Sequence, residues 1–412
     1  MLIKDVSLLQ SGGLLKGRDI LIEGNRISKI GRDLKDENKE ETIDGHGKLA
    51  IPGLVNSHTH LAMTLFRGYA DDMALMPWLT EKIWPLEARL TPEDIRWGVK
   101  LGCLEMIRFG ITCYNDMYYF MDETAAATKE MGLRAFLSGV LFDARPELMS
   151  EAEAFLKDWN GDDLIHPVVG PHAIYTCSEE TLLCARDLAE KYDAMLHIHL
   201  SETNDEVEES IKKHGMSPVE YLDSLRFLSN RLVAAHCVWV SETDITLLAR
   251  RRVNVAHCPV SNLKLAAGIA PVVSMLKAGV NVCLGADGAS SNNNLSPFEE
   301  MKAMAIVQKT ACRRPDVMPV EEVWKVATEN AYKAFGLDMG LREGALADLS
   351  LIDLKKPWFT PETNILSHLI YSIAGGVDTT IVNGRALMSG GVIPGEGEIL
   401  EKAQAQFERL TS

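Results

Sequence analysis

Two histidines separated by one residue follow a short apolar run and are the first residues in the chain that could bind a metal ion. The run Leu49–Val55 predicts a buried strand, and His58 and His60 stand at its end. Because side chains two apart on a strand point the same way, the two imidazoles face one side of the chain. Neutral imidazole is a common ligand of zinc. The pair alone is a weak signal, so further ligands must come from elsewhere.

Side chains that could bind a metal ion or transfer a proton recur at the ends of most of eight short apolar segments. These segments end at or near His58 and His60, Asn115–Asp116, Val140–Leu141, His172, His199, His236, His257 and Asp287. Helical patterns lie between most of them, and alternating strands and helices predict a parallel sheet with crossover helices. Eight such units over roughly 290 residues predict a TIM barrel, whose active site lies where the strands end. A doubly wound sheet would carry a glycine-rich dinucleotide turn, which this sequence lacks.

Six of the eight predicted strands bring a histidine or an aspartate to the same rim, which predicts a metal centre. Imidazoles and a carboxylate are ligands suited to zinc. Glu202, three residues after His199, could give or take a proton without binding the ion. His236 could be a ligand or a base beside the metal, and Asp287 could both bind the ion and accept a proton from water.

The remaining histidines receive less specific interpretations. His46 and His214 have no predicted role, and His166 begins the fourth strand, away from the rim. His197 has the same parity as His199, so it should point into the barrel one layer deeper, where a buried, hydrogen-bonded packing role is favoured over support of a metal ligand. His257 is predicted to be a wall residue of the pocket.

Both ends of the chain have the alternation of short antiparallel strands. Residues 1–50 alternate apolar and polar positions, with a hairpin predicted at Gly24-Asn25, and similar segments lie near residues 347–354 and 379–388. We therefore predict an α/β fold: a (β/α)8 barrel over residues 51–340 and a small β-sandwich domain built from residues 1–50 and 341–412, the latter including a terminal helix.

The composition excludes several classes of partner. Lys and Arg number 42 against 58 Asp and Glu, which gives a net charge of −16 and argues against binding to nucleic acid or to an anionic membrane. The eight cysteines form no C-x-x-C pair, and no stretch approaches 18 uninterrupted apolar residues. We expect reduced cysteines, a cytoplasmic location and a homo-oligomer.

Taken together, the motifs resemble the amidohydrolase superfamily over essentially the whole chain. The segments that carry the resemblance are Pro52–His60, Ile198–Thr203, Ala235–Cys237, Ser261–Lys264, Gly285–Gly288 and Gly344–Asp353. More narrowly, the chain is similar to the 5′-methylthioadenosine/S-adenosylhomocysteine deaminase family, which includes 5′-deoxyadenosine deaminases. That similarity rests on Met63–Gly68, Trp78-Leu79, Pro85–Leu90 and Gly170–His172.

This resemblance implies a set of site residues. It implies that one divalent ion, zinc first with iron or manganese as alternatives, is bound by His58, His60, His199 and Asp287. It also implies that Glu202 protonates purine N3 while His236 helps to orient and activate the water. For the substrate, it implies contacts of Glu87 with the ribose hydroxyls, of His172 with the purine and of Trp78 with the 5′ substituent. No lysine lies near the end of the fourth strand, so a carbamylated bridge between two ions is not expected.

The expected reaction is hydrolytic deamination of the adenine ring of a 5′-substituted adenosine, with release of ammonia. Candidate substrates are 5′-deoxyadenosine, 5′-methylthioadenosine, S-adenosylhomocysteine and adenosine. Gly139 stands where relatives that bind S-adenosylhomocysteine carry an arginine, and Arg145 is the candidate replacement. Ser291, in the polar loop that follows Asp287, is a further candidate contact. Two alternatives stay open: an amidohydrolase of another heterocycle, of the guanine deaminase or triazine chlorohydrolase type, and a non-catalytic barrel scaffold.

Overall fold

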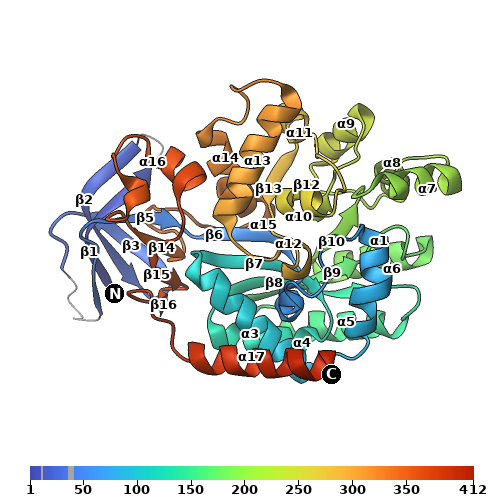
Figure 1. The fold of residues 1–412 in the computed structure, drawn as a ribbon, viewed down its shortest axis with the longest axis horizontal. Coiled ribbons are helices and arrows are strands. Elements are labelled where there is room, and N and C mark those ends of the chain that lie inside the picture. The colour runs from blue at the N-terminus through green and yellow to red at the C-terminus, as the bar shows by residue number, and fades with distance from the viewer. Residues whose placement is uncertain (11–12, 36–40) are drawn as a thin grey trace.

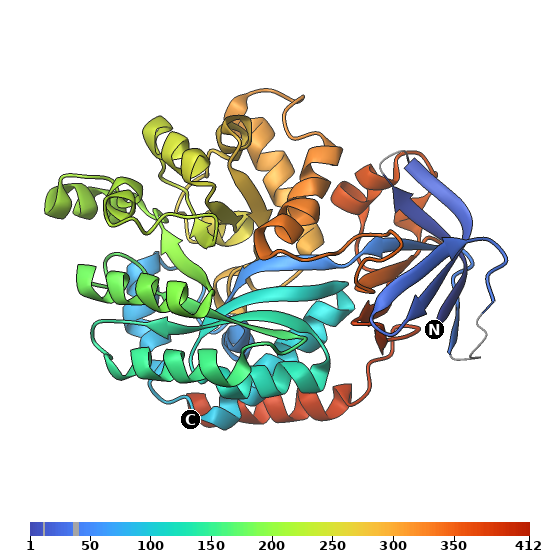
Figure 2. The same ribbon diagram turned by 180° about the vertical axis from the view of Figure 1, so that it is seen from behind.

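The computed structural model describes residues 1–10, 13–35 and 41–412, and two eight-stranded sheets organise them. One sheet has the order β13-β12-β11-β10-β9-β8-β7-β6, with every neighbouring pair parallel. Helices surround this sheet in Figures 1 and 2. The predicted TIM barrel is therefore confirmed, together with a small sheet domain at its side.

The eight barrel strands are the eight apolar segments that the sequence predicts. They are β6 (Leu54–Thr59), β7 (Ile111–Tyr118), β8 (Arg134–Leu141), β9 (Ile165–Pro171), β10 (Met195–Leu200), β11 (Leu232–His236), β12 (Asn254–His257) and β13 (Asn281–Leu284). Nearly all of their residues are buried, as expected for parallel strands covered on both faces. The barrel closes where the amide of Asp287 donates to the carbonyl of His58 (2.9 Å) and the amide of Ala286 donates to Asn56 Oδ1 (2.9 Å).

The segments between and after the barrel strands form the outer helices, several of which begin or end with recognisable caps. They are α3 (Pro92–Arg108), α4 (Met121–Met131), α5 (Glu147–Trp159), α6 (Glu179–Tyr192), α7 (Asn204–His214), α8 (Pro218–Ser224), α9 (Glu242–Arg251), α11 (Val272–Ala278), α13 (Pro297–Cys312), α14 (Val320–Ala327) and α15 (Glu329–Phe335). Helices α3, α8 and α9 start with capping boxes, in which the N-cap hydroxyl and a carboxylate three residues later satisfy backbone amides. Gly132 and Gly215 end α4 and α7 in the left-handed conformation.

Both termini contribute to the second sheet. Its strands are β1 (Leu2–Gln10), β2 (Gly13–Glu23), β3 (Arg26–Gly31), β4 (Thr42–Asp44), β5 (Lys48–Pro52), β14 (Leu349–Asp353), β15 (Val377–Val382) and β16 (Arg385–Met388). They run in the order β16-β15-β14-β5-β1-β2-β3, with β4 also paired to β1. The hairpin predicted at Gly24-Asn25 joins β2 to β3. The division of the chain into domains at residues 51 and 341 stays a prediction.

A buried ion pair and a terminal helix connect this sheet to the barrel. Arg134 Nε at the start of β8 lies 3.1 Å from Asp348 Oδ2 beside β14, and both side chains are buried. Helix α17 (Glu396–Thr411) leaves the small sheet and runs along the barrel beside α3 (Figure 1). The short helices η3 (Pro357–Phe359), α16 (Ile365–Ser367) and η4 (His368–Ser372) lie between β14 and β15.

Short helices follow the barrel strands on the side where the strands end. After β6 come η1 (Leu61–Phe66), α1 (Leu75–Trp78), η2 (Leu79–Ile83) and α2 (Trp84–Glu87), while α10 (Pro259–Lys264) follows β12 and α12 (Ala289–Asn292) follows β13.

All eight cysteines are free thiols, and six of them are buried. Within the part of the chain that the structure describes, no helix has the length and apolar character needed to cross a membrane.

Candidate active site

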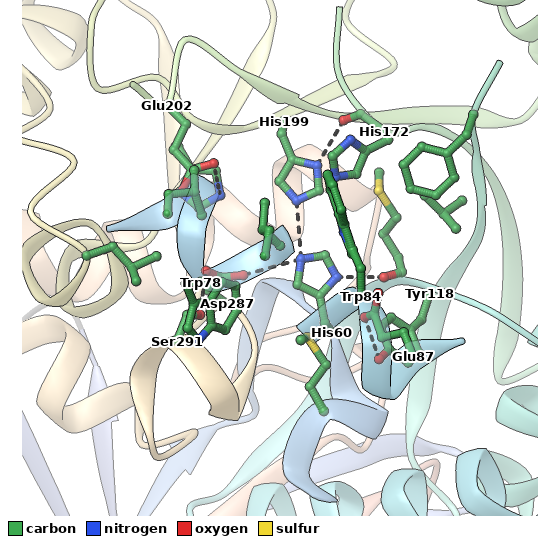
Figure 3. A pocket seen from close by; sticks show the side chains of 18 of the residues that line it. His60, Trp78, Trp84, Glu87, Tyr118, His172, His199, Glu202, Asp287 and Ser291 are labelled. Atoms are coloured by element: carbon green, nitrogen blue, oxygen red, sulfur yellow. Dashed lines mark hydrogen bonds and ion pairs between the residues drawn. The ribbon is translucent and has the colours of Figure 1, made fainter. Parts of the chain in front are cut away.

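Three imidazoles and one carboxylate converge at the ends of β6, β10 and β13. His199 Nε2 lies 3.2 Å from His60 Nε2, and Asp287 Oδ1 lies 3.3 Å from His58 Nε2 and 3.4 Å from His60 Nε2. In Figure 3 the His60 ring stands between Asp287 and His199. The strand-end pattern of the sequence therefore brings these four residues together in space.

The Nδ1 atoms of His60 and His199, which do not face this group, form hydrogen bonds with backbone carbonyls. His60 Nδ1 lies 2.6 Å from the carbonyl of Met117, and His199 Nδ1 lies 2.9 Å from the carbonyl of His172. Since a carbonyl can only accept, both Nδ1 atoms carry the hydrogen, and the Nε2 lone pairs point at one another. Burial lowers the pKa of His58 to about 4 and that of His199 well below its usual range. Both imidazoles are therefore neutral at neutral pH, the form that binds a metal ion. The group fits a divalent metal ion.

His197 points into the barrel, as its parity with His199 predicts, and it is buried and hydrogen-bonded. Its partner is a residue of the metal group, because His197 Nε2 lies 2.8 Å from His58 Nδ1 across the barrel interior. If His58 Nε2 faces the metal group, His58 Nδ1 donates and His197 Nε2 accepts. His197 Nδ1 in turn lies 3.3 Å from Ser138 Oγ, which donates to the carbonyl of Asp116 at 2.7 Å. His197 thus orients His58 rather than only filling space.

Asp287 is held with its two oxygens in different roles. Its Oδ2 accepts hydrogen bonds from Ser261 Oγ (2.6 Å) and Ser291 Oγ (2.8 Å), which leaves Oδ1 facing the histidines. The residue has a positive φ of 61°, so the backbone turns sharply where β13 ends. Burial would raise its pKa, but the contact with His58 and the neighbouring imidazoles of His236 and His60 keep that pKa well below the usual range. Asp287 is therefore an ionised carboxylate at this site.

Glu202 and His236 form an acid–base pair beside this group. Glu202 Oε2 lies 3.9 Å from His236 Nε2, and both side chains are buried. His236 Nδ1 lies 2.8 Å from Asn262 Oδ1, so it carries the hydrogen and its Nε2 faces inward. Burial raises the pKa of Glu202. Burial would lower the pKa of His236, but the nearby carboxylates of Glu202 and Asp287 outweigh it, so the pKa of His236 is raised. Glu202 can therefore hold a proton more readily than an exposed glutamate.

A pocket opens beside these residues and encloses about 640 Å³ of empty space, a figure that includes open solvent at its mouth. Five of the predicted substrate contacts line it: Trp78, Glu87, His172, Glu202 and Ser291. Figure 3 shows Glu87 and Tyr118 on the opposite side of the pocket from Glu202. The pocket thus places a second carboxylate at a distance from the metal group.

Burial favours the neutral form of both Glu87 and His172. Tyr118 Oη donates to Glu87 Oε1 at 2.7 Å, and burial raises the pKa of Glu87 to about 7. Burial lowers the pKa of His172 to about 3, and its Nδ1 lies 2.8 Å from Thr176 Oγ1. His172 is therefore neutral and Glu87 is close to half-protonated at neutral pH.

Two predicted positions differ from the site that the structure forms. Arg145 does not line the pocket; it lies in an adjoining cavity, with its guanidinium 5.6 Å from the Tyr119 ring centre and 3.0 Å from exposed Glu147. His257, predicted as a pocket wall, is instead fully buried and lies outside the pocket lining. Its strand ends at the expected rim, and strand parity alone could not decide whether its side chain reaches the pocket.

Sequence reasoning missed the aromatic residues that complete the pocket. These are Trp84, Tyr118, Tyr119, Phe142 and Tyr175. Trp84 immediately precedes the segment that contains Glu87, and Phe142 directly follows β8. Their positions next to a recognised motif and at a strand end are the sequence features that could have indicated a place in the pocket. Ser261 and Asn262 belong to the segment Ser261–Lys264, which carries part of the amidohydrolase resemblance. The sequence does not show that they contact Asp287 and His236.

The barrel and its strand-end histidines and aspartate define a metal-dependent hydrolase of the TIM-barrel class. The amidohydrolase family model matches residues 49–387, and the chain belongs to this family.

Curated relatives and solved structures agree with this membership over the full length of the chain. A 5′-deoxyadenosine deaminase of Methanothrix thermoacetophila is 66% identical over 412 residues and covers 100% of both chains. A 5-methylthioadenosine/S-adenosylhomocysteine deaminase of Archaeoglobus fulgidus is 44% identical and covers 100% of this chain and 99% of its own. The zinc-bound crystal structure of an adenosine deaminase from Xanthomonas campestris superposes with a TM-score of 0.94 at 32% identity, covering 100% and 98% of the two chains.

Proposed function

We propose that this protein is a metal-dependent deaminase that hydrolyses the adenine ring of 5′-substituted adenosines to the inosine analogue and ammonia. One observation carries the proposal. A single pocket holds the metal-binding group and the Glu202–His236 pair, and on its opposite side lies the Glu87 carboxyl. The names of relatives that are 44–66% identical over the whole chain support the same reaction.

In this proposal His58, His60, His199 and Asp287 hold one divalent ion. Zinc suits three imidazoles and a carboxylate, and iron and manganese bind the same donor atoms. When bound, such an ion supplies Lewis acidity that brings the pKa of water from 15.7 towards about 7.

The protein side chains manage the protons of the reaction. Asp287 accepts a proton from the attacking water as oxygen adds to C6, and Glu202 gives its proton to purine N3 so that charge does not accumulate on the ring. His236 orients the water through Nε2. The C6–N bond then breaks, the amine takes up the proton held by Asp287, and N3 returns its proton to Glu202. Water and the adenine ring become the hypoxanthine ring and ammonia.

The far side of the pocket recognises the nucleoside. Glu87 accepts hydrogen bonds from the ribose hydroxyls, neutral His172 contacts the purine, and Trp78 packs near the 5′ substituent. Ser291 acts mainly through Asp287, to which it donates. Since Arg145 lies in the adjoining cavity, only a long 5′ substituent would reach it. Of the described residues that line the pocket itself, none is an arginine, so we place substrates with small neutral 5′ groups, such as 5′-deoxyadenosine and 5′-methylthioadenosine, before S-adenosylhomocysteine.

A panel of nucleosides tests the proposal. Purified, metal-loaded protein is supplied with 5′-deoxyadenosine, 5′-methylthioadenosine, adenosine and S-adenosylhomocysteine, and ammonia release is followed together with the spectral change from adenine to hypoxanthine. Guanine and a chlorinated triazine serve as substrates of the alternative heterocycle reaction. Turnover of an adenosine supports the proposal; turnover of guanine or triazine alone would replace it, and no turnover of any compound would favour a scaffold role.

A further inference from the structure

The buried carboxylate of Glu206 takes no part in the reaction described above, yet it contacts the turn that carries Glu202. Glu206 Oε1 accepts the amide of Ser201 at 2.9 Å, and Oε2 accepts the amide of Glu202 at 2.8 Å. Glu206 is 5% exposed, and in the described ranges no lysine or arginine forms an ion pair with it. Burying a carboxylate without a cationic partner costs folding free energy. The presence of Glu206 at this position therefore needs an explanation in what its two hydrogen bonds do.

Ordinary helix capping does not provide that explanation. Glu206 is the third residue of α7 after the N-cap Thr203, the position from which a capping-box carboxylate reaches back to the N-cap amide. Asp94, Glu220 and Asp244 do this at the starts of α3, α8 and α9. Glu206 instead reaches past Thr203 to the two residues before it. Its bonds therefore hold the end of β10 rather than the helix.

The turn that Glu206 holds is bent and fixed from both sides. Ser201 has a left-handed φ of 51°, which turns the chain out of β10 and points two successive amides at one acceptor. The carbonyl of Ser201 accepts the amides of Val238 (3.0 Å) and Trp239 (2.9 Å) from the segment after β11. With the amide of Glu202 also fixed, the direction in which its side chain leaves the backbone is set.

We propose that Glu206 is a positioning residue that fixes the Glu202 carboxyl against the substrate ring through the amides of residues 201 and 202. This inference rests on the proposed function. A carboxylate is required because both oxygens must accept; the amide of glutamine has the same shape but would set an N–H donor against another N–H. Small misplacements of a reacting group lower the turnover rate strongly while leaving ground-state binding nearly intact.

Glu206→Gln tests the inference, with Glu220→Gln as the matched control on the neighbouring helix. We expect Glu206→Gln to lower kcat by about tenfold or more, with KM within about twofold and metal content unchanged. Glu220→Gln, which weakens a capping box without touching the site, should stay within about twofold of the parent in kcat. An unchanged kcat in folded, metal-loaded Glu206→Gln would overturn the inference.

A double-mutant cycle separates positioning from general damage. If Glu206 acts only through Glu202, the Glu206→Gln change should cost nothing further in a Glu202→Gln background. Losses that multiply would overturn the inference. If Glu206→Gln does not yield folded protein, Glu206→Asp, which keeps the charge but retracts it by one methylene, is measured in the same way, and an unchanged kcat again overturns it.

Hydrogen exchange provides a readout that needs no substrate. The amides of Ser201 and Glu202 should exchange at least about tenfold faster in Glu206→Gln than in the parent protein and in Glu220→Gln. Unchanged exchange at both amides would overturn the inference. If the parent protein deaminates no adenosine, the proposed function fails, while exchange still reports whether Glu206 holds this turn.

Discussion

The imidazole of His58 is supported by a second imidazole, that of His197, with Nδ1 and Nε2 separated by 2.8 Å. Metal-binding histidines usually donate this hydrogen to a carboxylate or a backbone carbonyl. Here a neutral histidine accepts it, because burial and the surrounding imidazoles lower the pKa of His197 well below its usual range. This contact ties the first barrel strand to the fifth through the barrel interior.

Replacing His197 should therefore weaken metal binding. We expect His197→Phe to lower metal affinity about 10–100-fold in competition with a chelator, because His58 loses its acceptor, and His197→Gln to retain more of the affinity. His166→Phe is the control, since His166 lies at the start of β9, away from the metal group. Equal affinities for His197→Phe and the parent would show that His58 needs no such support.

Glu202→Gln should separate proton transfer from metal binding. We expect kcat to fall about 10²-fold or more, while metal content and fold remain, because the amide cannot supply a proton to N3. Glu209→Gln, an exposed substitution on α7, is the control. Steady-state kinetics and metal analysis check this, and a Glu202→Gln enzyme of normal kcat would remove Glu202 from the mechanism.

Loss of the two serine hydroxyls that hold Asp287 should reduce turnover. Ser261→Ala and Ser291→Ala each remove one hydrogen bond to Oδ2, so we expect kcat to fall about tenfold in each, since a bond to a charged group contributes about 1.5–3 kcal/mol. Ser290→Ala is the matched control, because Ser290 Oγ contacts Met63 Sδ at 3.4 Å instead. If the control loses as much activity as the other two, the effect lies in the loop and not in Asp287.

Glu87 should make stability depend on pH in the direction opposite to that of an ion-paired carboxylate. Burial raises its pKa from 4.5 to about 7, so the folded state keeps a proton that the unfolded state releases. The resulting destabilisation is absent below pH 4.5 and grows as pH rises to about 7.

Glu87→Gln removes this effect. Its free energy of unfolding, relative to the parent protein, should therefore rise between pH 5 and pH 8, as measured by denaturant unfolding at both values. A difference that is the same at both pH values would show that Glu87 titrates normally. Because Glu87 is proposed to hold the ribose, the same variant should raise KM for the nucleoside.

The sequence by itself determined the barrel and most of the candidate site. Strand residues alternate, and parallel barrel strands end at one rim, so His58, His60, His199, Glu202 and Asp287 could be placed together before their contacts were known. These predictions depend on local periodicity and on the known geometry of one architecture.

The tertiary structure alone decided which side chains meet. His197 and His58 are 139 residues apart and touch only because the barrel closes with a particular strand register. His257 is buried outside the pocket lining, and Arg145 lies in the adjoining cavity, because loops and strand ends bend in ways that periodicity does not encode. The hydrogen bonds from the amides of Ser201 and Glu202 to the Glu206 carboxylate likewise depend on a left-handed turn at Ser201. Contacts across the barrel and conformations at strand ends are set by packing of the whole chain, and a local pattern cannot contain them.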